Sequence, residues 1–238
     1  MRDRIIVALD QPDLAGAMAC ARALQGHARW VKVGITLFYR EGPAAVAAMR
    51  ELGYDVFVDL KLHDIPHQVE GAARALGALG AGMLTVHASG GPAMVEAAVR
   101  GSAEGAAAAG MPAPAVIAVT VLTSIDAETL RAVGVTDPPA EQAAGLAALA
   151  KTAGAHGVVC SPQEAADLRA LLGPHALIVT PGVRPAGSDA GDQARIATPA
   201  AAFAAGASHI VIGRPVTGAP DPAAAFEAIV TDLEEARV

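Results

Sequence analysis

Short runs of aliphatic and β-branched residues alternate along the chain with longer segments rich in alanine and leucine. Runs of this length are typical of buried parallel strands, and the segments between them have the length of helices. The runs lie at residues 5–9, 30–35, 55–61, 83–89, 115–122, 156–161, 176–183 and 209–216. Many helical segments end in a glycine before the next strand, as a C-terminal helix cap favours. These glycines are Gly53, Gly80, Gly110, Gly154, Gly173 and Gly206.

This alternation predicts an α/β protein with the (β/α)8 TIM-barrel fold. Eight strands, each followed by a helix, in a chain of 238 residues match the size and order of such a barrel. A doubly wound sheet is the alternative, but no glycine-rich dinucleotide loop follows the first strand. No linker or shift in composition marks a second domain, so we expect a single (β/α)8 barrel domain over residues 1–238. Two long connections, 123–139 and 184–198, should lie at the C-terminal face of the barrel, where active sites are built.

Composition and charge narrow the possible functions. Hydrophobic residues make up 53% of the chain and aromatic residues only 3%, so the core should consist of small aliphatic side chains. A net charge of −7 without a basic block argues against nucleic-acid binding, although a local pocket could still bind a small anion. The two cysteines have no metal-like spacing, which is typical of a reduced, cytoplasmic protein. The apolar stretches are too short or too interrupted for a signal peptide or a membrane span.

The stretch VDLKLHDIPH combines an apolar strand with charged residues at its end. Alternation along this strand places Asp59 and Lys61 on the same face, while Val58, Leu60 and Leu62 face the other way. A purely structural ion pair is possible. Because a buried ion pair contributes little stability, its position at the mouth of a barrel favours a functional role.

Other predicted strands bring polar residues to the same rim, namely Asp10, Lys32, His87, Thr123, Arg184 and Arg214. Two of these have ordinary structural explanations: Asp10 could cap the next helix, and His87 is more simply a hydrogen-bonded interior residue. Lys32 interrupts an apolar strand, so it must either extend to solvent or find a carboxylate.

The last two strands carry the signature of an anion site. Gly213 and Arg214 follow the eighth strand, and a glycine-rich loop after the seventh contains Arg184 and Gln193. Glycine lets backbone N–H groups approach an anion, arginine binds its oxygens, and barrel phosphate sites commonly use these two loops. The alternative is a solvated loop with incidental arginines.

The ordered set VALD, WVKVG, VDLKLHDIP, VTVLTS, PGVR, GDQAR and IVIGRPV resembles the bacterial orotidine 5′-monophosphate decarboxylase family over essentially the whole chain. The DxKxxD element alone is also found in related sugar-phosphate decarboxylases. The resemblance implies decarboxylation of orotidine 5′-monophosphate to UMP in de novo pyrimidine biosynthesis, without cofactor or metal, by a homodimer.

The resemblance also implies roles for individual residues. Lys32, Asp59, Lys61 and Asp64 would form an alternating array, with Asp64 given by the neighbouring subunit and Lys61 protonating C6 of the pyrimidine. Asp10 and Lys32 would hold the ribose hydroxyls, and Thr123 would face the pyrimidine. The phosphate and the loop over it would be held by Arg184, Gln193, Gly213 and Arg214. The implied substrate-binding stretch is continuous: Asp59, Leu60, Lys61, Leu62, His63, Asp64, Ile65, Pro66, His67 and Gln68.

One departure from the family pattern is visible, because His67 and Gln68 stand where the family usually has Asn-Thr. Gln68 can form hydrogen bonds like those of the threonine that contacts the ribose, so we expect altered local geometry rather than lost activity. Two other functions remain possible. One is a Mg²⁺-dependent sugar-phosphate lyase, which would need an acid where Lys32 stands; the other is a nucleotide-binding protein without turnover.

Overall fold

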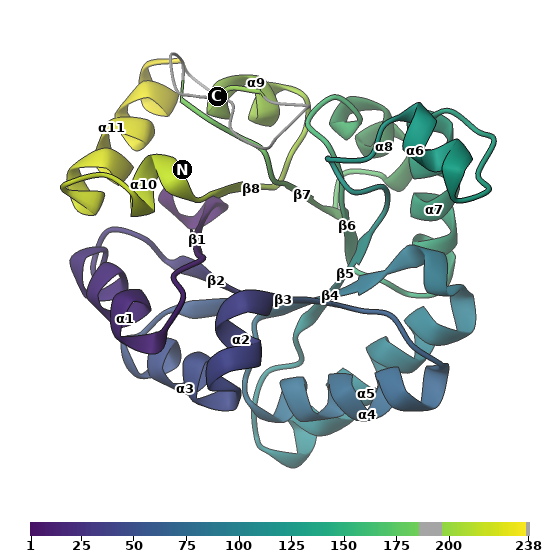
Figure 1. Cartoon of the computed structure of the whole chain (residues 1–238), viewed down its shortest axis with the longest axis horizontal. Coiled ribbons are helices and arrows are strands. Elements are labelled where there is room, and N and C mark those ends of the chain that lie inside the picture. Colours follow the sequence, from purple (N-terminus) through teal and green to yellow (C-terminus); the bar gives the residue numbers. More distant parts are fainter. Residues whose placement is uncertain (186–196, 237–238) are drawn as a thin grey trace.

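The computed structural model describes residues 1–185 and 197–236 of the chain. Eight parallel strands pair in chain order, and β1 closes the barrel against β8 (Figure 1). The strands are β1 Ile5–Leu9, β2 Trp30–Gly34, β3 Asp55–Leu62, β4 Met83–His87, β5 Ala115–Val119, β6 Gly157–Val159, β7 Leu177–Thr180 and β8 His209–Ile212. The predicted (β/α)8 barrel is therefore confirmed.

Helices surround the barrel on its outer side (Figure 1). They are α1 Leu14–Ala23, α2 Ile35–Glu41, α3 Pro43–Glu51, α4 Pro66–Ala78, α5 Pro92–Ala108, α6 Ala127–Ala132, α7 Pro139–Thr152, α8 Ala165–Leu172, α9 Pro199–Ala204, α10 Arg214–Thr217 and α11 Pro222–Glu235. Proline occupies the first turn of α4, α5, α7 and α11, where its missing N–H costs no hydrogen bond. The six predicted capping glycines all have positive φ, between 66° and 99°. No helix among residues 1–185 and 197–236 is long and apolar enough to cross a membrane.

Alternation along the strands separates two hydrophobic layers. In β3, Val56 and Val58 are fully buried between the strands and the outer helices. Phe57 points inward and packs in the barrel interior with Ile6, Ala8, Met83, Ile117, Val179 and Val211. This apolar layer fills the interior of the barrel, and the charged side chains that line the cavity lie toward its C-terminal end.

The structure corrects several predicted boundaries at the C-terminal ends of strands. β8 ends at Ile212, and Arg214 is the first residue of α10 rather than the end of a strand. β4 ends at His87 and continues into a 3-10 helix, Ala88–Gly90. The long connection after β5 contains α6, which begins after a capping aspartate, Asp126. Hydrophobic runs overestimate strand length here because the apolar residues continue into the loops that line the barrel mouth.

Candidate active site

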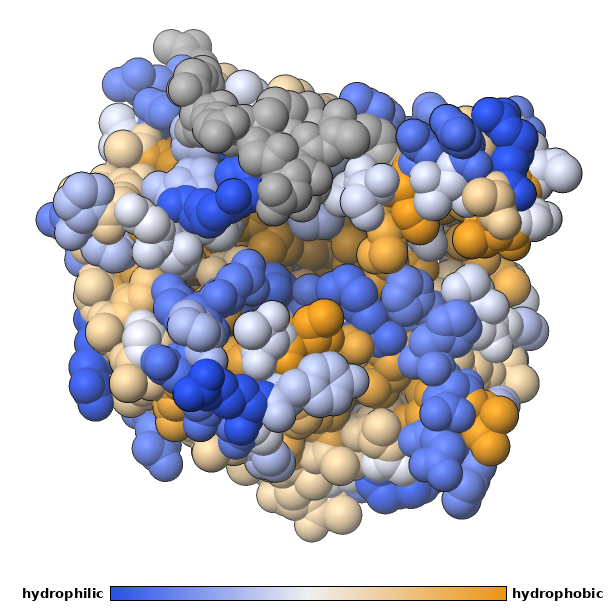
Figure 2. Space-filling model, viewed as in Figure 1, coloured by the Kyte–Doolittle hydropathy of each residue, from blue (hydrophilic) through white to orange (hydrophobic). Residues whose placement is uncertain are grey.

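A cavity of about 650 Å³ opens at the C-terminal ends of the strands. Figure 2 shows it as a hollow in the centre of this face, with hydrophilic side chains along one edge. Its volume is in the range of small-molecule sites. Eight of the predicted site residues line it: Asp10, Lys32, Asp59, Lys61, Thr123, Arg184, Gly213 and Arg214.

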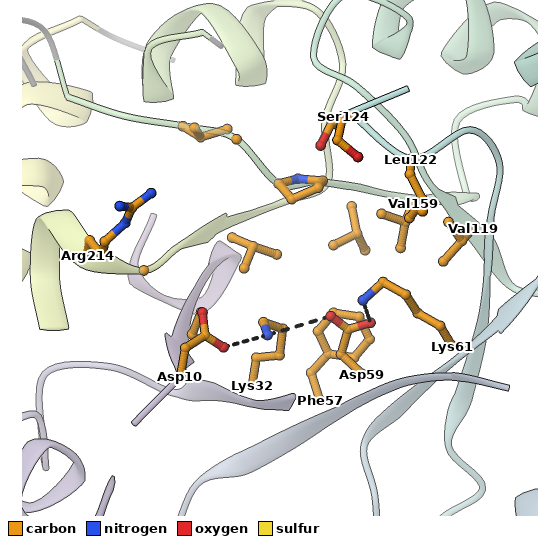
Figure 3. A pocket seen from close by; sticks show the side chains of 18 of the residues that line it. Asp10, Lys32, Phe57, Asp59, Lys61, Val119, Leu122, Ser124, Val159 and Arg214 are labelled. Atoms are coloured by element: carbon orange, nitrogen blue, oxygen red, sulfur yellow. Dashed lines mark hydrogen bonds and ion pairs between the residues drawn. The ribbon is translucent and has the colours of Figure 1, made fainter. Parts of the chain in front are cut away.

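One wall of the cavity is a row of alternating charges from β1, β2 and β3 (Figure 3). The Lys32 Nζ atom lies 3.0 Å from Asp10 Oδ1 and 3.6 Å from Asp59 Oδ2. Lys61 Nζ donates to Asp59 Oδ1 at 2.8 Å. The predicted shared face of Asp59 and Lys61 is thus confirmed. Asp10 does not cap α1, since that role belongs to Asp13.

The ion pairs keep the buried members of this row charged. The side chains of Lys32 and Asp59 are each only 12% exposed. Burial alone would raise the pKa of Asp59, but the charges of Lys32 and Lys61 and the hydrogen bonds to its carboxylate lower that pKa below its usual value. Burial would likewise lower the pKa of Lys32, and Asp59 and Asp10 raise it instead. The site therefore holds a fixed array of charges along one wall of the cavity.

The backbone at Lys61 has an unusual conformation. Lys61 has a φ of 52° and is the one non-glycine residue with positive φ among the described residues. It lies where the β3–β4 register shifts, between the pairs Val58–Leu84 and Leu62–Val86. A left-handed conformation is unfavourable for a lysine, and such strain tends to occur at functional sites. The local sequence gave no sign of this irregularity.

The opposite wall is apolar and comes from the ends of β5, β6 and β7. Figure 3 shows Val119, Leu122 and Val159 facing the charged row across the cavity. We did not predict these residues from the sequence. They could have been predicted from strand alternation, as Asp59 was, by taking the last inward-facing residue of each strand. The cavity thus has one charged and one apolar wall, which suits a flat molecule with an ionic edge.

One of the predicted anion-binding residues, Arg214, lies away from Lys61. Arg214, at the start of α10, and Lys61 lie at opposite ends of the view in Figure 3. Arg184 also lines the cavity, and within the part of the chain that the structure describes its buried Nε atom has no hydrogen-bond partner. A buried guanidinium N–H without a partner favours a bound anion. Gln193 lies outside the described residues, so its predicted role stays a prediction.

The rest of the predicted stretch does not line the cavity in the single chain. Leu60 and Leu62 pack against the outer hydrophobic core. The residues from His63 to Gln68 are exposed. Their predicted contacts with substrate stay a prediction.

His87 is also absent from the cavity lining. Its ring lies 5.4 Å from that of His63, measured between centroids. Burial, followed by the nearby His63 and Lys61, lowers the pKa of His87.

Among the residues that the structure describes, no cluster of three or more His, Cys, Asp or Glu side chains has the arrangement of a metal site.

Comparison with known proteins identifies the family. The model of the "Orotidine 5'-phosphate decarboxylase / HUMPS family" matches residues 3–229. The chain belongs to this family. Among curated members, orotidine 5'-phosphate decarboxylase from Anaeromyxobacter sp. (strain K) is 56% identical over 231 residues, covering 97% of this chain and 98% of that protein. The one from Moorella thermoacetica is 55% identical, covering 98% and 93%.

A solved family structure has the same fold. The crystal structure of orotidine 5'-phosphate decarboxylase from Lactobacillus acidophilus superposes with a TM-score of 0.84 at 41% identity, covering 98% of this chain and 99% of that one. An uncharacterized conserved protein from Geobacillus kaustophilus gives a TM-score of 0.83, also at 41% identity, with coverages of 96% and 99%. The family resemblance seen in the sequence motifs is confirmed.

Proposed function

We propose that this protein decarboxylates orotidine 5′-monophosphate to UMP in cytoplasmic pyrimidine biosynthesis, without a cofactor. The observation that carries the proposal is the Lys61 side chain, held 2.8 Å from Asp59 at the edge of the cavity. The names of the curated relatives support the same reaction.

The chemistry explains why the site alternates acids and bases. Loss of CO2 leaves an electron pair at C6 in the plane of the pyrimidine ring, where the π-system cannot delocalise it. A positioned ammonium group can stabilise this charge and then donate a proton to C6. In our proposal Lys61 has this role, and Asp59 orients it. The apolar wall would cover the ring and exclude water.

The phosphate would bind at the other end of the cavity. Arg214 lies at that end (Figure 3), Arg184 also lines the cavity, and Gly213 lies between the last strand and α10. Asp10 and Lys32, between the two ends, would hold the ribose hydroxyls, and Thr123 would face the pyrimidine. Binding energy from a phosphate remote from C6 can organise the site for the chemical step.

The position of Lys32 argues against the metal-dependent alternative. A sugar-phosphate lyase of the same superfamily would need carboxylates free to bind Mg²⁺. Here the Lys32 Nζ atom lies between Asp10 and Asp59, so the place for a cation is taken by an ammonium group. Hard divalent cations prefer oxygen ligands that no competing cation occupies.

The first experiment measures consumption of orotidine 5′-monophosphate by absorbance, with and without a chelator. We expect the same rate in both.

Lys61→Ala should abolish turnover while UMP still binds, because Lys61 acts in the transition state. Lys151→Ala is the matched control, since Lys151 is exposed and, among residues 1–185 and 197–236, its Nζ forms one hydrogen bond, to the Leu171 carbonyl oxygen at 3.2 Å. Decarboxylation by Lys61→Ala within about tenfold of the parent would exclude Lys61 as the proton donor.

We further propose that the active unit is a homodimer in which Asp64 completes the neighbouring site. Asp64 is exposed and outside the cavity lining of its own chain. The next residue, Ile65, is 63% exposed, and Tyr39 is 80% exposed. The exposed Ile65 next to Asp64, and the exposed Tyr39 on α2, support a contact with a second copy.

Exchange of subunits between two inactive variants tests this arrangement. Asp64→Asn keeps an oxygen that can accept the Ile65 N–H, which Asp64 Oδ1 does at 2.6 Å. If Asp64 acts in the partner's site, each mixed dimer of Asp64→Asn and Lys61→Ala has one intact site. Random mixing at equal amounts should then restore about a quarter of parental activity. No recovery after confirmed exchange would contradict the shared site.

A further inference from the structure

The charged row depends on a break in the hydrogen-bonding between β3 and β4. Four residue steps on β3, from Val58 to Leu62, correspond to two steps on β4, from Leu84 to Val86. Such an insertion removes regular ladder bonds and redirects side chains. The N–H of Lys61 lies within this break, so it needs a partner other than the usual β4 carbonyl.

That partner is the side chain of Thr85, in the middle of β4. The Thr85 Oγ1 atom accepts the Lys61 backbone N–H at 2.8 Å and donates to Asp59 Oδ1 at 3.0 Å. Thr85 has no exposed surface. A hydroxyl has one donor, so donation to the carboxylate leaves its lone pairs for the amide, and both contacts are satisfied together.

The hydroxyl therefore connects the strained backbone of Lys61 to the carboxylate that orients its side chain. Asp59 Oδ1 accepts from both Thr85 and Lys61 Nζ, while Oδ2 faces Lys32. Three strands thus fix the rotation of one carboxylate. Without the hydroxyl, both the Lys61 amide and one side of Asp59 would lose their link to β4.

We propose that Thr85 is a positioning residue that holds Asp59 and the Lys61 backbone in the geometry needed for proton transfer. The inference rests on the proposed decarboxylase function. Thr85 does not line the cavity, so it acts through Asp59 and Lys61 rather than on the substrate. The sequence contains one sign of this placement, because Thr85 shares a strand face with His87 and with Met83 of the barrel interior.

The test compares Thr85→Val, which keeps the shape but lacks the hydroxyl, with Thr85→Ser, which retains it. For Thr85→Val we expect kcat to fall by about 10²-fold, the loss that a small misplacement of reacting groups produces. The KM and the UMP dissociation constant should change less than about threefold, because ground-state contacts remain. Thr85→Ser should restore kcat to within about threefold of the parent.

Thr180→Val is the matched control. Thr180 is also fully buried on a barrel strand, but within the described residues its Oγ1 atom forms a single hydrogen bond, to the His209 carbonyl oxygen at 3.4 Å. Its kcat should stay close to the parent's, and circular dichroism checks that all variants are folded. If Thr85→Val does not fold, the smaller Thr85→Ala replaces it.

Several results would overturn the role of Thr85. The first is a kcat of Thr85→Val within about threefold of the parent's, and the second is a Thr85→Ser enzyme as slow as Thr85→Val. The third is an equal loss of kcat in Thr180→Val. The fourth is that Thr85→Val and Thr85→Ala both fail to fold. An inactive parent enzyme would instead refute the proposed function, so the two failures are distinguishable.

Discussion

Replacing Gly105 by alanine should destabilise the protein, because α5 crosses α4 with almost no space between the two backbones. A Cβ atom on Gly105 would lie closer than 3.0 Å to the Arg74 carbonyl oxygen of α4. Cβ atoms on Gly101 of α5 and Gly77 of α4 would also lie closer than 3.0 Å to a backbone oxygen across the same interface. Since a backbone carbonyl cannot rotate away, the two helices would have to separate.

The expected magnitude follows from two opposing effects. Overpacking costs ~1–3 kcal/mol, and contact with a rigid backbone places Gly105→Ala at the upper end. Better helix propensity returns up to ~1 kcal/mol. The free energy of unfolding should therefore fall by about 2 kcal/mol or more, which lowers the melting temperature by ~4–8 °C for a chain of this size.

Urea and thermal unfolding followed by circular dichroism measure this change. Gly71→Ala is the matched control, because Gly71 lies in α4 and is exposed, and beyond its chain neighbours and its own helix backbone no described atom lies within 4 Å of the added Cβ position. It should stabilise the protein by ~0.5–1 kcal/mol. A Gly105→Ala protein as stable as Gly71→Ala would refute the packing argument. The packing of α4 against α5 also affects the position of Asp64, since α4 begins just after the loop that carries this residue.

Three other predictions concern charged groups. Arg214→Ala should raise the KM for orotidine 5′-monophosphate strongly but leave turnover of the substrate without phosphate unchanged; equal losses on both would make Arg214 structural. The pKa of Asp59 is lower in the folded protein than in the unfolded chain, where it is ~3.9. The ionised Asp59 therefore stabilises the folded protein fully above pH ~3.9, and this stabilisation is lost as the pH falls through the pKa of the folded state. The difference in unfolding free energy between the parent and Asp59→Asn should therefore shrink as the pH is lowered below the unfolded pKa. A difference that grows on acidification would contradict the lowered pKa of Asp59. Burial, followed by nearby arginines, lowers the pKa of His209 to about 4. The NMR titration of His209 should therefore have its midpoint near pH 4, and the free energy of unfolding should fall as the pH drops from about 6.5 toward 4. A titration midpoint near the usual histidine pKa of ~6.5 would instead show that the ring is hydrated.

Much of the barrel could be predicted from the sequence because parallel strands and helices have different periods. Strand β1 has the predicted bounds, and β3 differs by one residue from its prediction. The alternation that separated Asp59 and Lys61 from Leu60 and Leu62 also holds. Hydrophobicity could not give the true end of β8, because Val216 remains buried after the strand has become α10.

The sequence alone determined the fold, the charged strand end and the residue types at the barrel mouth, since these follow from local periodicity and chemistry. Only the tertiary structure decided how the charges pair. The contacts of Lys32 with both Asp10 and Asp59 join three strands and depend on their relative register. The same is true of Thr85, whose hydroxyl meets Lys61 only because two extra residues in β3 break the ladder. Register between strands is set by packing of the whole barrel, and no local sequence pattern records it.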